Sequence, residues 1–290
     1  MRSEQVAIAA RICAVCGQDG LVEHGTVNSY CLLRCPACGF IAASGVADEQ
    51  LADFYERDYF EGKLAYGYGS AQAAETDLIA QPLAPVHEWV IAKYLDPLDP
   101  QAILEIGPGL GGGWIKRFAA GSPRLLQCVE ISALASERLN AAGIPTFNGR
   151  VEDFRSESTF DLAIAIEVIE HVADPVSFVT AICDLLAPGG HLLLSTGNAR
   201  SITAKRTGLD WYYLDPPAHL SYFDDRNIAQ LLRRAGFDEV RVRRFGFKWV
   251  ELAMRYGLTA ALPLVHALNY PSGMLVIARK AVADKRASGA

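Results

Sequence analysis

The chain has 290 residues, a formal net charge of −6 and 51% hydrophobic residues. This length suffices for one sizeable core and a small additional module. The net negative charge disfavours a protein that binds nucleic acid through its phosphates. We see no N-terminal signal pattern and no uncharged apolar run of about 18 residues. We therefore expect a cytoplasmic protein with a small-molecule partner.

Four of the seven cysteines form two CxxCG motifs, which begin at Cys13 and Cys35 and are separated by a hairpin-sized stretch. Each motif places two thiolates on one side of a tight turn, and together they supply the four sulfurs that tetrahedral Zn²⁺ accepts. We predict a structural zinc ribbon. Its ligands are Cys13, Cys16, Cys35 and Cys38. A redox pair and a catalytic zinc are the alternatives, although a four-thiolate cage leaves no position for a substrate.

A tyrosine-rich segment follows, over residues 55–69. Its glycines and aromatic residues favour a mobile segment, in which Tyr59, Tyr66 and Tyr68 are candidates to face a substrate. The alternative is that these tyrosines pin the cysteine module to the core. A helix is expected next, from Glu75 to Tyr94, because apolar residues recur there at helical spacing.

The stretch 102–130 has the pattern of a βαβ unit. The apolar run 103–106 predicts a strand buried on both faces. Gly107, Gly109 and Gly111 then let the backbone turn sharply and approach a ligand closely. A second apolar run, 125–129, ends in Glu130, where a carboxylate can take both hydroxyls of a ribose. We expect a cofactor that contains a nucleoside.

Glu105 lies two residues before the first glycine, where it can pair with a cationic amino-acid end of a ligand, directly or through water. S-adenosylmethionine has such an end and NAD does not. The residues EIGPGLG at 105–111 resemble the first motif of class I S-adenosylmethionine-dependent methyltransferases. The resemblance extends from about Leu78 to Lys280. An NAD-linked oxidoreductase is the rival interpretation of the glycines.

The resemblance implies an α/β protein with a Rossmann-like sheet of seven strands. The later strands are expected near residues 144–147, 160–166, 188–196, 240–245 and 274–278. In the family, the end of the third strand holds the adenine, although Arg150 stands where the family has an aspartate. The expected cofactor contacts are Glu105, Gly107, Pro108, Gly109, Gly111, Glu130, Ile131, Val151, Glu152, Asp153 and Glu167.

The fourth strand runs directly into Glu167-Val168-Ile169-Glu170-His171. If Glu167 opens a helix, Glu170 and His171 share its face, at the sheet edge where such folds bind ligands. The segment resembles the ExxEH motif of ubiquinone-pathway O-methyltransferases and small-RNA 2′-O-methyltransferases, which implies Mg²⁺ or a similar ion. A HLxYF-type segment of the family supplies a further histidine, here His219. The implied metal ligands are Glu167, Glu170, His171 and His219.

Two other interpretations of these residues stay open. In the first, Glu170, His171 and His219 act without a metal, with a histidine as general base. In the second, they are structural. The aromatic loop 210–223 is a natural substrate wall, so Trp211 and Tyr222 are expected to face the acceptor.

A helical apolar insertion is expected over residues 248–270. Ordinary packing over the core is the default interpretation. Covering the substrate, pairing in a homodimer and lying on a membrane surface are the alternatives, and membrane contact is not expected.

We divide the chain into a zinc ribbon (1–45), a helical and tyrosine-rich linker and lid (46–98), the methyltransferase domain (99–282) and a polar tail (283–290). The predicted activity is methyl transfer from S-adenosylmethionine to a hydroxyl of a small metabolite, a sugar or a quinone-like acceptor. The alternatives are sugar C-methylation with a histidine or tyrosine base, RNA 2′-O-methylation, and a non-catalytic zinc-ribbon interaction protein.

Overall fold

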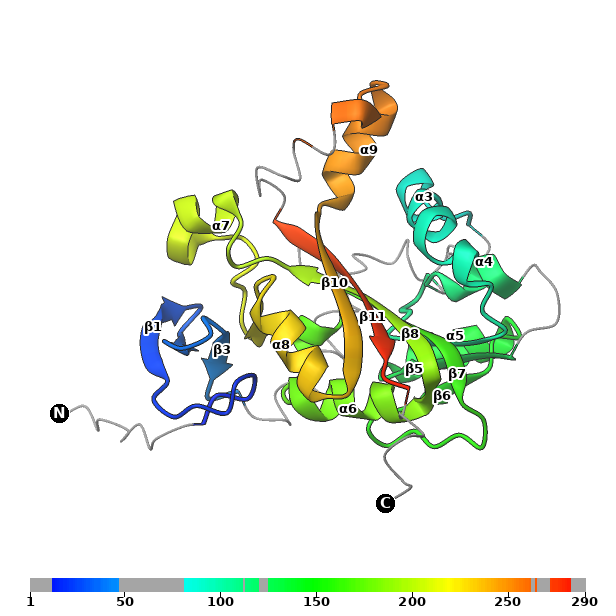
Figure 1. The fold of residues 1–290 in the computed structure, drawn as a ribbon, viewed down its shortest axis with the longest axis horizontal. Helices are drawn as coiled ribbons and strands as arrows, with labels where there is room; N and C mark the ends of the chain where they lie inside the picture. The colour runs from blue at the N-terminus through cyan, green and yellow to red at the C-terminus, as the bar shows by residue number, and fades with distance from the viewer. Residues whose placement is uncertain are drawn as a thin grey trace, which may run out of the picture.

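The computed structural model describes residues 12–46, 81–111, 113–119, 125–261, 264 and 272–282. Figure 1 shows a twisted sheet with helices on both faces, and the small N-terminal module of β1 and β3 beside it. Tyr59, Tyr66 and Tyr68, the polar tail and most of the expected linker lie outside the described residues, so the expectations for them stay predictions.

The large sheet has seven strands in the order β10-β11-β8-β7-β4-β5-β6. Their bounds are β4 Ala102–Ile106, β5 Leu125–Glu130, β6 Thr146–Asn148, β7 Phe160–Ile166, β8 Leu186–Gly197, β10 Phe237–Phe245 and β11 Gly273–Lys280. The five neighbouring strands β6, β5, β4, β7 and β8 are parallel to one another, while β11 is antiparallel to both β8 and β10. This is the Rossmann-like sheet of seven strands that the sequence predicts.

Helices cover both faces of this sheet. They are α3 Pro85–Tyr94, α4 Ile115–Ala119, α5 Ala133–Ala141, α6 Pro175–Leu185, α8 Asn227–Arg234 and α9 Phe247–Arg255. A further helix, α7 Ile202–Thr207, packs beside the small N-terminal module instead. Alternate residues of β4 point to opposite faces, so Leu104 joins a core with Phe178 of α6 and Leu231 of α8. On the other face Ile103 joins Val90 of α3, as well as residues of α4, α5 and α9.

Two predicted helices differ from the observed ones. The described chain before Pro85 is not helical, and α3 begins with that proline at its first turn, where the missing N–H is not needed. The expected insertion 248–270 overlaps α9, which begins at Phe247 and is followed by a short 3₁₀ helix, η5 Thr259–Ala261. Val250 and Ala253 pack α9 onto the core. None of the helices in the described ranges has the length and apolar character needed to cross a bilayer.

The cysteine module, residues 12–46, contains β1 Val22–Val27, β2 Tyr30–Arg34 and β3 Ile41–Ser44. These strands form an antiparallel sheet whose fourth strand, β9 Ser221–Tyr222, comes from the segment that follows α7. The module and the large domain therefore share a sheet across the boundary that the sequence suggested near residue 45.

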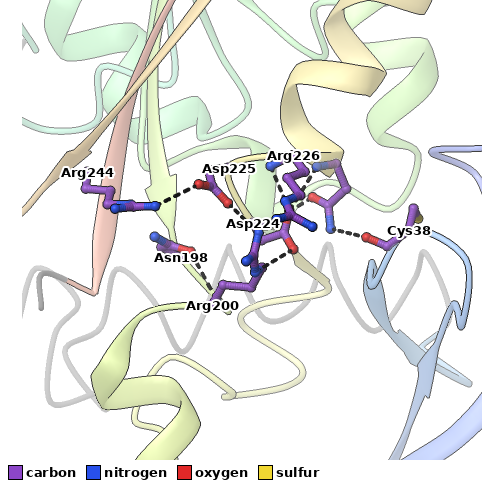
Figure 2. A network of polar contacts seen from close by, with 8 residues as sticks. Cys38, Asn198, Arg200, Asp224, Asp225, Arg226 and Arg244 are labelled. Carbon is purple, nitrogen blue, oxygen red and sulfur yellow. Dashed lines mark hydrogen bonds and ion pairs between the residues drawn. The ribbon is translucent and has the colours of Figure 1, made fainter. Parts of the chain in front are cut away.

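A polar network fastens the module to the large domain (Figure 2). The Asn227 side-chain amide donates to the Cys38 carbonyl at 3.4 Å. Beside it, Asp225 accepts from Arg200 at 3.1 Å and from Arg244 at 3.3 Å. The Asn227 bond joins the module to the start of α8, and the Asp225 contacts tie the segment before α8 to Arg200 and to β10.

Candidate functional site

A cavity of about 750 Å³ opens at the carboxyl ends of β4, β5 and β7. The chain leaves β4 toward β5 on one side and later returns to β7 on the other, so the cavity lies at the switch point of the sheet. Its volume is within the usual range for small-molecule sites. The expected cofactor residues that line it are Glu105, Gly107, Pro108, Gly109, Gly111, Glu130, Ile131, Val151, Glu152 and Glu167.

Glu105 fastens the glycine loop. Its carboxylate is 2% exposed and accepts hydrogen bonds from the N–H groups of Trp114 at 2.8 Å and Ile115 at 2.6 Å. Gly113 has a φ of +52°, and a Cβ there would lie 2.3 Å from the Glu105 carboxylate. Burial raises the pKa of Glu105 to about 7. The sequence suggested a ligand contact for Glu105, and the structure adds this backbone-holding role.

Glu130 ties the same loop to the end of β5. One carboxylate oxygen accepts from the Gly109 N–H at 2.9 Å, and the other accepts from the Ser132 N–H at 2.9 Å. Burial raises the pKa of this carboxyl as well. Glu130 therefore lies at the cavity wall with its orientation fixed by two backbone groups.

The turn after β6 brings two of the three expected adenine contacts to the cavity. Val151 is buried and lines it, and Glu152 lines it while paired with Arg150 at 3.0 Å. Asp153 is exposed and lies outside the lining. Glu152 is therefore the carboxylate of this turn that can face a ligand in the cavity.

Glu167 does not open a helix, contrary to the sequence-based expectation. Its backbone has a φ of +53°, and its N–H donates to the Ser195 carbonyl of β8 at 3.1 Å. A short 3₁₀ helix, η3, begins only at Ile169 and ends at His171. Left-handed backbone at a residue other than glycine is costly and is concentrated at functional sites.

Tyr213, which the sequence analysis missed, joins the two carboxylates. Its hydroxyl contacts Glu167 at 3.0 Å and Glu170 in a shorter contact, while the Ser195 hydroxyl donates to Glu167 at 2.6 Å. The tyrosine has one proton to donate, so the second contact requires a proton on one of the carboxyl groups. Burial, together with repulsion from Glu170, raises the pKa of Glu167 to about 8. Burial raises that of Glu170 to about 7.

Both histidines are oriented by backbone carbonyls. The His171 Nδ1 lies 2.7 Å from the Ala218 carbonyl, and the His219 Nδ1 lies 2.7 Å from the Tyr213 carbonyl. A carbonyl only accepts, so each Nδ1 carries the proton and each Nε2 carries the lone pair. Burial lowers the pKa of His171 to about 4 and that of His219 to about 3, so both rings are neutral at pH 7.

Glu170, His171 and His219 form one cluster, with a ligand atom of each within 4.8 Å of the others. Glu170 is fully buried, and its second carboxylate oxygen has no hydrogen-bond partner among the described residues. Two imidazole nitrogens and a carboxylate suit a divalent ion. Glu167, the fourth ligand implied by the family, is linked to this cluster through Tyr213 instead. His171 belongs both to the cluster and to the cavity wall.

Trp211 and Tyr222 are placed differently from the prediction that they face the acceptor. They are 2% and 1% exposed and pack against Leu32 and Ile41 of the cysteine module. Neither is among the residues that line the cavity. The module covers the aromatic loop that the sequence suggested as a substrate wall.

The four cysteines of the two motifs meet in a second cluster, with all sulfurs within 4.8 Å of one another. The Cys13–Cys38 and Cys16–Cys35 sulfur pairs are each 3.6 Å apart. Sulfurs at the corners of a tetrahedron around Zn²⁺ are about 3.8 Å apart, given a Zn–S bond of about 2.3 Å. The donor set and its spacing therefore fit a metal ion bound by four thiolates.

Comparisons with known proteins agree with this fold. A family model described as a methyltransferase domain matches residues 86–242. A ubiquinone biosynthesis O-methyltransferase of Cereibacter sphaeroides is 29% identical over 158 residues, which are 50% of this chain and 64% of that protein. The enzyme of another strain is 36% identical over 186 residues, 57% of this chain and 70% of that protein.

A solved structure shows the same fold. The plantazolicin methyltransferase BamL, in complex with a triazolic desmethylPZN analog and S-adenosylhomocysteine, covers 79% of this chain and 94% of its own, with 16% identity and a TM-score of 0.51. The family match overturns the rival interpretation as an NAD-linked oxidoreductase. The chain belongs to the methyltransferase domain family and is a class I S-adenosylmethionine-dependent methyltransferase.

Proposed function

We propose that this protein transfers the methyl group of S-adenosylmethionine to a hydroxyl of a small metabolite, a sugar or a quinone-like acceptor. The observation that carries the proposal is one cavity whose wall contains two chemically different groups of residues. We call the glycine loop with Glu130 the cofactor end, and Glu167 with His171 the acceptor end. Relatives named as O-methyltransferases support an oxygen acceptor.

At the cofactor end, each contact has a residue suited to it. The Glu130 carboxylate would accept from the ribose hydroxyls, Val151 would pack on the adenine, and Glu152 would accept from its amine. Glu105 would keep the glycine loop in place beside the amino-acid end of the cofactor. When bound, S-adenosylmethionine supplies an electrophilic methyl group, so the protein has only to position the acceptor and assist loss of its proton.

At the acceptor end, we propose that Glu170, His171 and His219 hold a divalent ion such as Mg²⁺. The buried Glu170 oxygen without a described partner and the Nε2 lone pairs support this assignment. Such an ion would lower the pKa of an acceptor hydroxyl. The residues themselves would orient the acceptor oxygen, since His171 belongs both to the cluster and to the cavity wall.

We also propose that Cys13, Cys16, Cys35 and Cys38 bind a structural Zn²⁺. Four thiolates complete its coordination, so the ion would have no open position for a substrate. The role of this site would be to hold the cysteine module folded, as the CxxCG pattern predicts.

An acceptor screen tests the proposed activity. The zinc-loaded enzyme is incubated with S-adenosylmethionine, catechols, hydroxylated quinones or sugar nucleotides, and formation of S-adenosylhomocysteine is measured with and without Mg²⁺. Mass spectrometry and NMR of the product then separate O-methyl from C-methyl groups. We expect an O-methyl product whose formation falls when a chelator removes Mg²⁺. A C-methyl product formed equally well without a divalent ion would contradict the proposal.

A further inference from the structure

The segment Tyr213–Tyr222, here called the His219 segment, supplies the two carbonyl groups that accept from the imidazoles. Its carbonyls at Tyr213 and Ala218 accept from His219 and His171 respectively. On its inner side the Leu220 N–H donates to the Glu170 carbonyl at 2.7 Å. The geometry of the cluster therefore depends on where this segment lies.

The outer side of the same segment is bound to the cysteine module. β9, at its end, pairs with β3, so that Ile41 lies opposite Tyr222 and Ala42 opposite Ser221. The Ala43 N–H donates to the Leu220 carbonyl at 2.8 Å. Leu220 is thus bonded to the acceptor end through its N–H and to the module through its carbonyl.

Asn28 makes a second connection at the other end of the segment. It lies in the two-residue turn between β1 and β2, with a φ of +48°. Its side-chain amide donates to the Asp215 carboxylate at 2.7 Å and to the Pro216 carbonyl at 3.0 Å. The Asp215 carbonyl in turn accepts from the His219 N–H at 3.0 Å. One side chain of the module therefore holds the turn that leads into His219.

The module is itself held in place by contacts that do not involve the His219 segment. The Arg234 guanidinium of α8 donates to the Ala14 carbonyl at 3.1 Å and to the Val15 carbonyl. Asn227 donates to the Cys38 carbonyl, and the network around Asp225 anchors that part of the chain (Figure 2). The module can therefore act as a fixed support for the segment.

We propose that the cysteine module positions the acceptor end of the active site, and that Asn28 is a positioning residue acting on His219 through Asp215 and Pro216. The role of His219 in catalysis rests on the proposed function, but its position can be measured without any acceptor. The cofactor end should not depend on Asn28, because the hydrogen bonds of its side chain go to Asp215 and Pro216 and Asn28 is not part of the cavity wall.

NMR of the zinc-loaded protein bound to S-adenosylhomocysteine tests this inference. The histidine rings are labelled with ¹⁵N, and exchange of the Nδ1 protons with water is measured, with signals assigned by His171→Gln and His219→Gln. The wild type is compared with Asn28→Gly, which removes the side chain but tolerates the left-handed backbone. Ser29→Gly, at the neighbouring turn position with a φ of +69°, is the matched control.

We expect Asn28→Gly to raise the exchange rate of the His219 Nδ1 proton about 10-fold, since two hydrogen bonds to its supporting turn are lost. Zinc content and affinity for S-adenosylhomocysteine should stay at the wild-type values, and Ser29→Gly should leave the exchange unchanged. Unchanged exchange in Asn28→Gly would overturn the inference, as would a parallel loss of cofactor affinity, which would indicate general loosening. Whether the protein methylates an oxygen acceptor is tested separately by the acceptor screen, so the proposed function can fail while the role of Asn28 holds.

Discussion

The cofactor end and the acceptor end of the proposed active site are built in different ways. At the cofactor end, both carboxylates accept from backbone N–H groups of the same βαβ unit, Glu130 from Gly109 and Glu105 from the residues Trp114 and Ile115. At the acceptor end, the Glu170 and His171 turn meets Tyr213 and His219 from a distant segment, which the cysteine module supports from outside. A local unit can therefore fix cofactor binding, while acceptor chemistry depends on contacts between segments far apart in the chain. We therefore expect a substitution at one end to leave the function of the other end unchanged.

The largest effect is expected at the acceptor end. Glu170→Gln removes a charged ligand from the cluster and should lower the rate of methyl transfer about 1000-fold. Affinity for S-adenosylhomocysteine should stay within about twofold of the wild type, because Glu170 does not line the cavity. Single-turnover kinetics and calorimetry measure the two quantities. A matched loss of both would erase the proposed separation of the two ends.

The second largest effect is expected from loss of the four-cysteine site. Cys35→Ser removes a zinc ligand and should lower the free energy of unfolding by about 3 kcal/mol or more, with zinc lost and S-adenosylhomocysteine still bound. Metal analysis and denaturant unfolding measure this, with Cys31→Ser as control because Cys31 lies outside the sulfur cluster. Normal zinc content and stability in Cys35→Ser would refute the structural zinc assignment.

A substitution in the glycine loop should disrupt the cofactor end. Gly113→Ala places a Cβ against the Glu105 carboxylate at a φ of +52°, and should cost about 3 kcal/mol of stability and much of the cofactor affinity. Gly143→Ala has the same backbone problem at a φ of +79° but meets nothing within 4 Å, so it should cost only about 1 kcal/mol. Equal losses of stability in the two variants would show that the Glu105 contact is unimportant.

A smaller effect is expected from pH. The folded pKa of Glu105, about 7, is raised above its ordinary value of 4.5, so the folded state binds this proton more tightly than the unfolded state does. The contribution of Glu105 to stability should therefore fall by about 2 kcal/mol between pH 5 and pH 7. Glu105→Gln should lack this part of the pH dependence in denaturant unfolding measured across that range. Parallel curves for the two proteins would contradict the assigned shift.

The cofactor end could largely be predicted from the sequence, because its pattern is local. The apolar run before Gly107 and the run that ends in Glu130 became β4 and β5, and periodicity alone indicates such strands. The fourth strand, expected over 160–166, is likewise β7.

The acceptor end could be predicted only in part, because tertiary contacts decide it. A helix from Glu167 was a fair expectation from its spacing, but the Ser195 carbonyl of β8 takes the Glu167 N–H and the backbone turns left-handed. Trp211 and Tyr222 were expected to face the acceptor because their loop is aromatic. The pairing of β3 with β9, which covers this part of the loop, has no local signal in the sequence. Tyr213 lies in the same aromatic loop, and no local signal distinguishes it from its neighbours.

The most direct test of the acceptor end is calorimetric titration of Mn²⁺ into the zinc-loaded complex with S-adenosylhomocysteine, for the wild type and Glu170→Ala. The proposal predicts that the wild type binds one further ion and that the variant binds none, while both retain zinc. Absence of Mn²⁺ binding by the wild type, or equal binding by the variant, would contradict a divalent ion held by Glu170, His171 and His219.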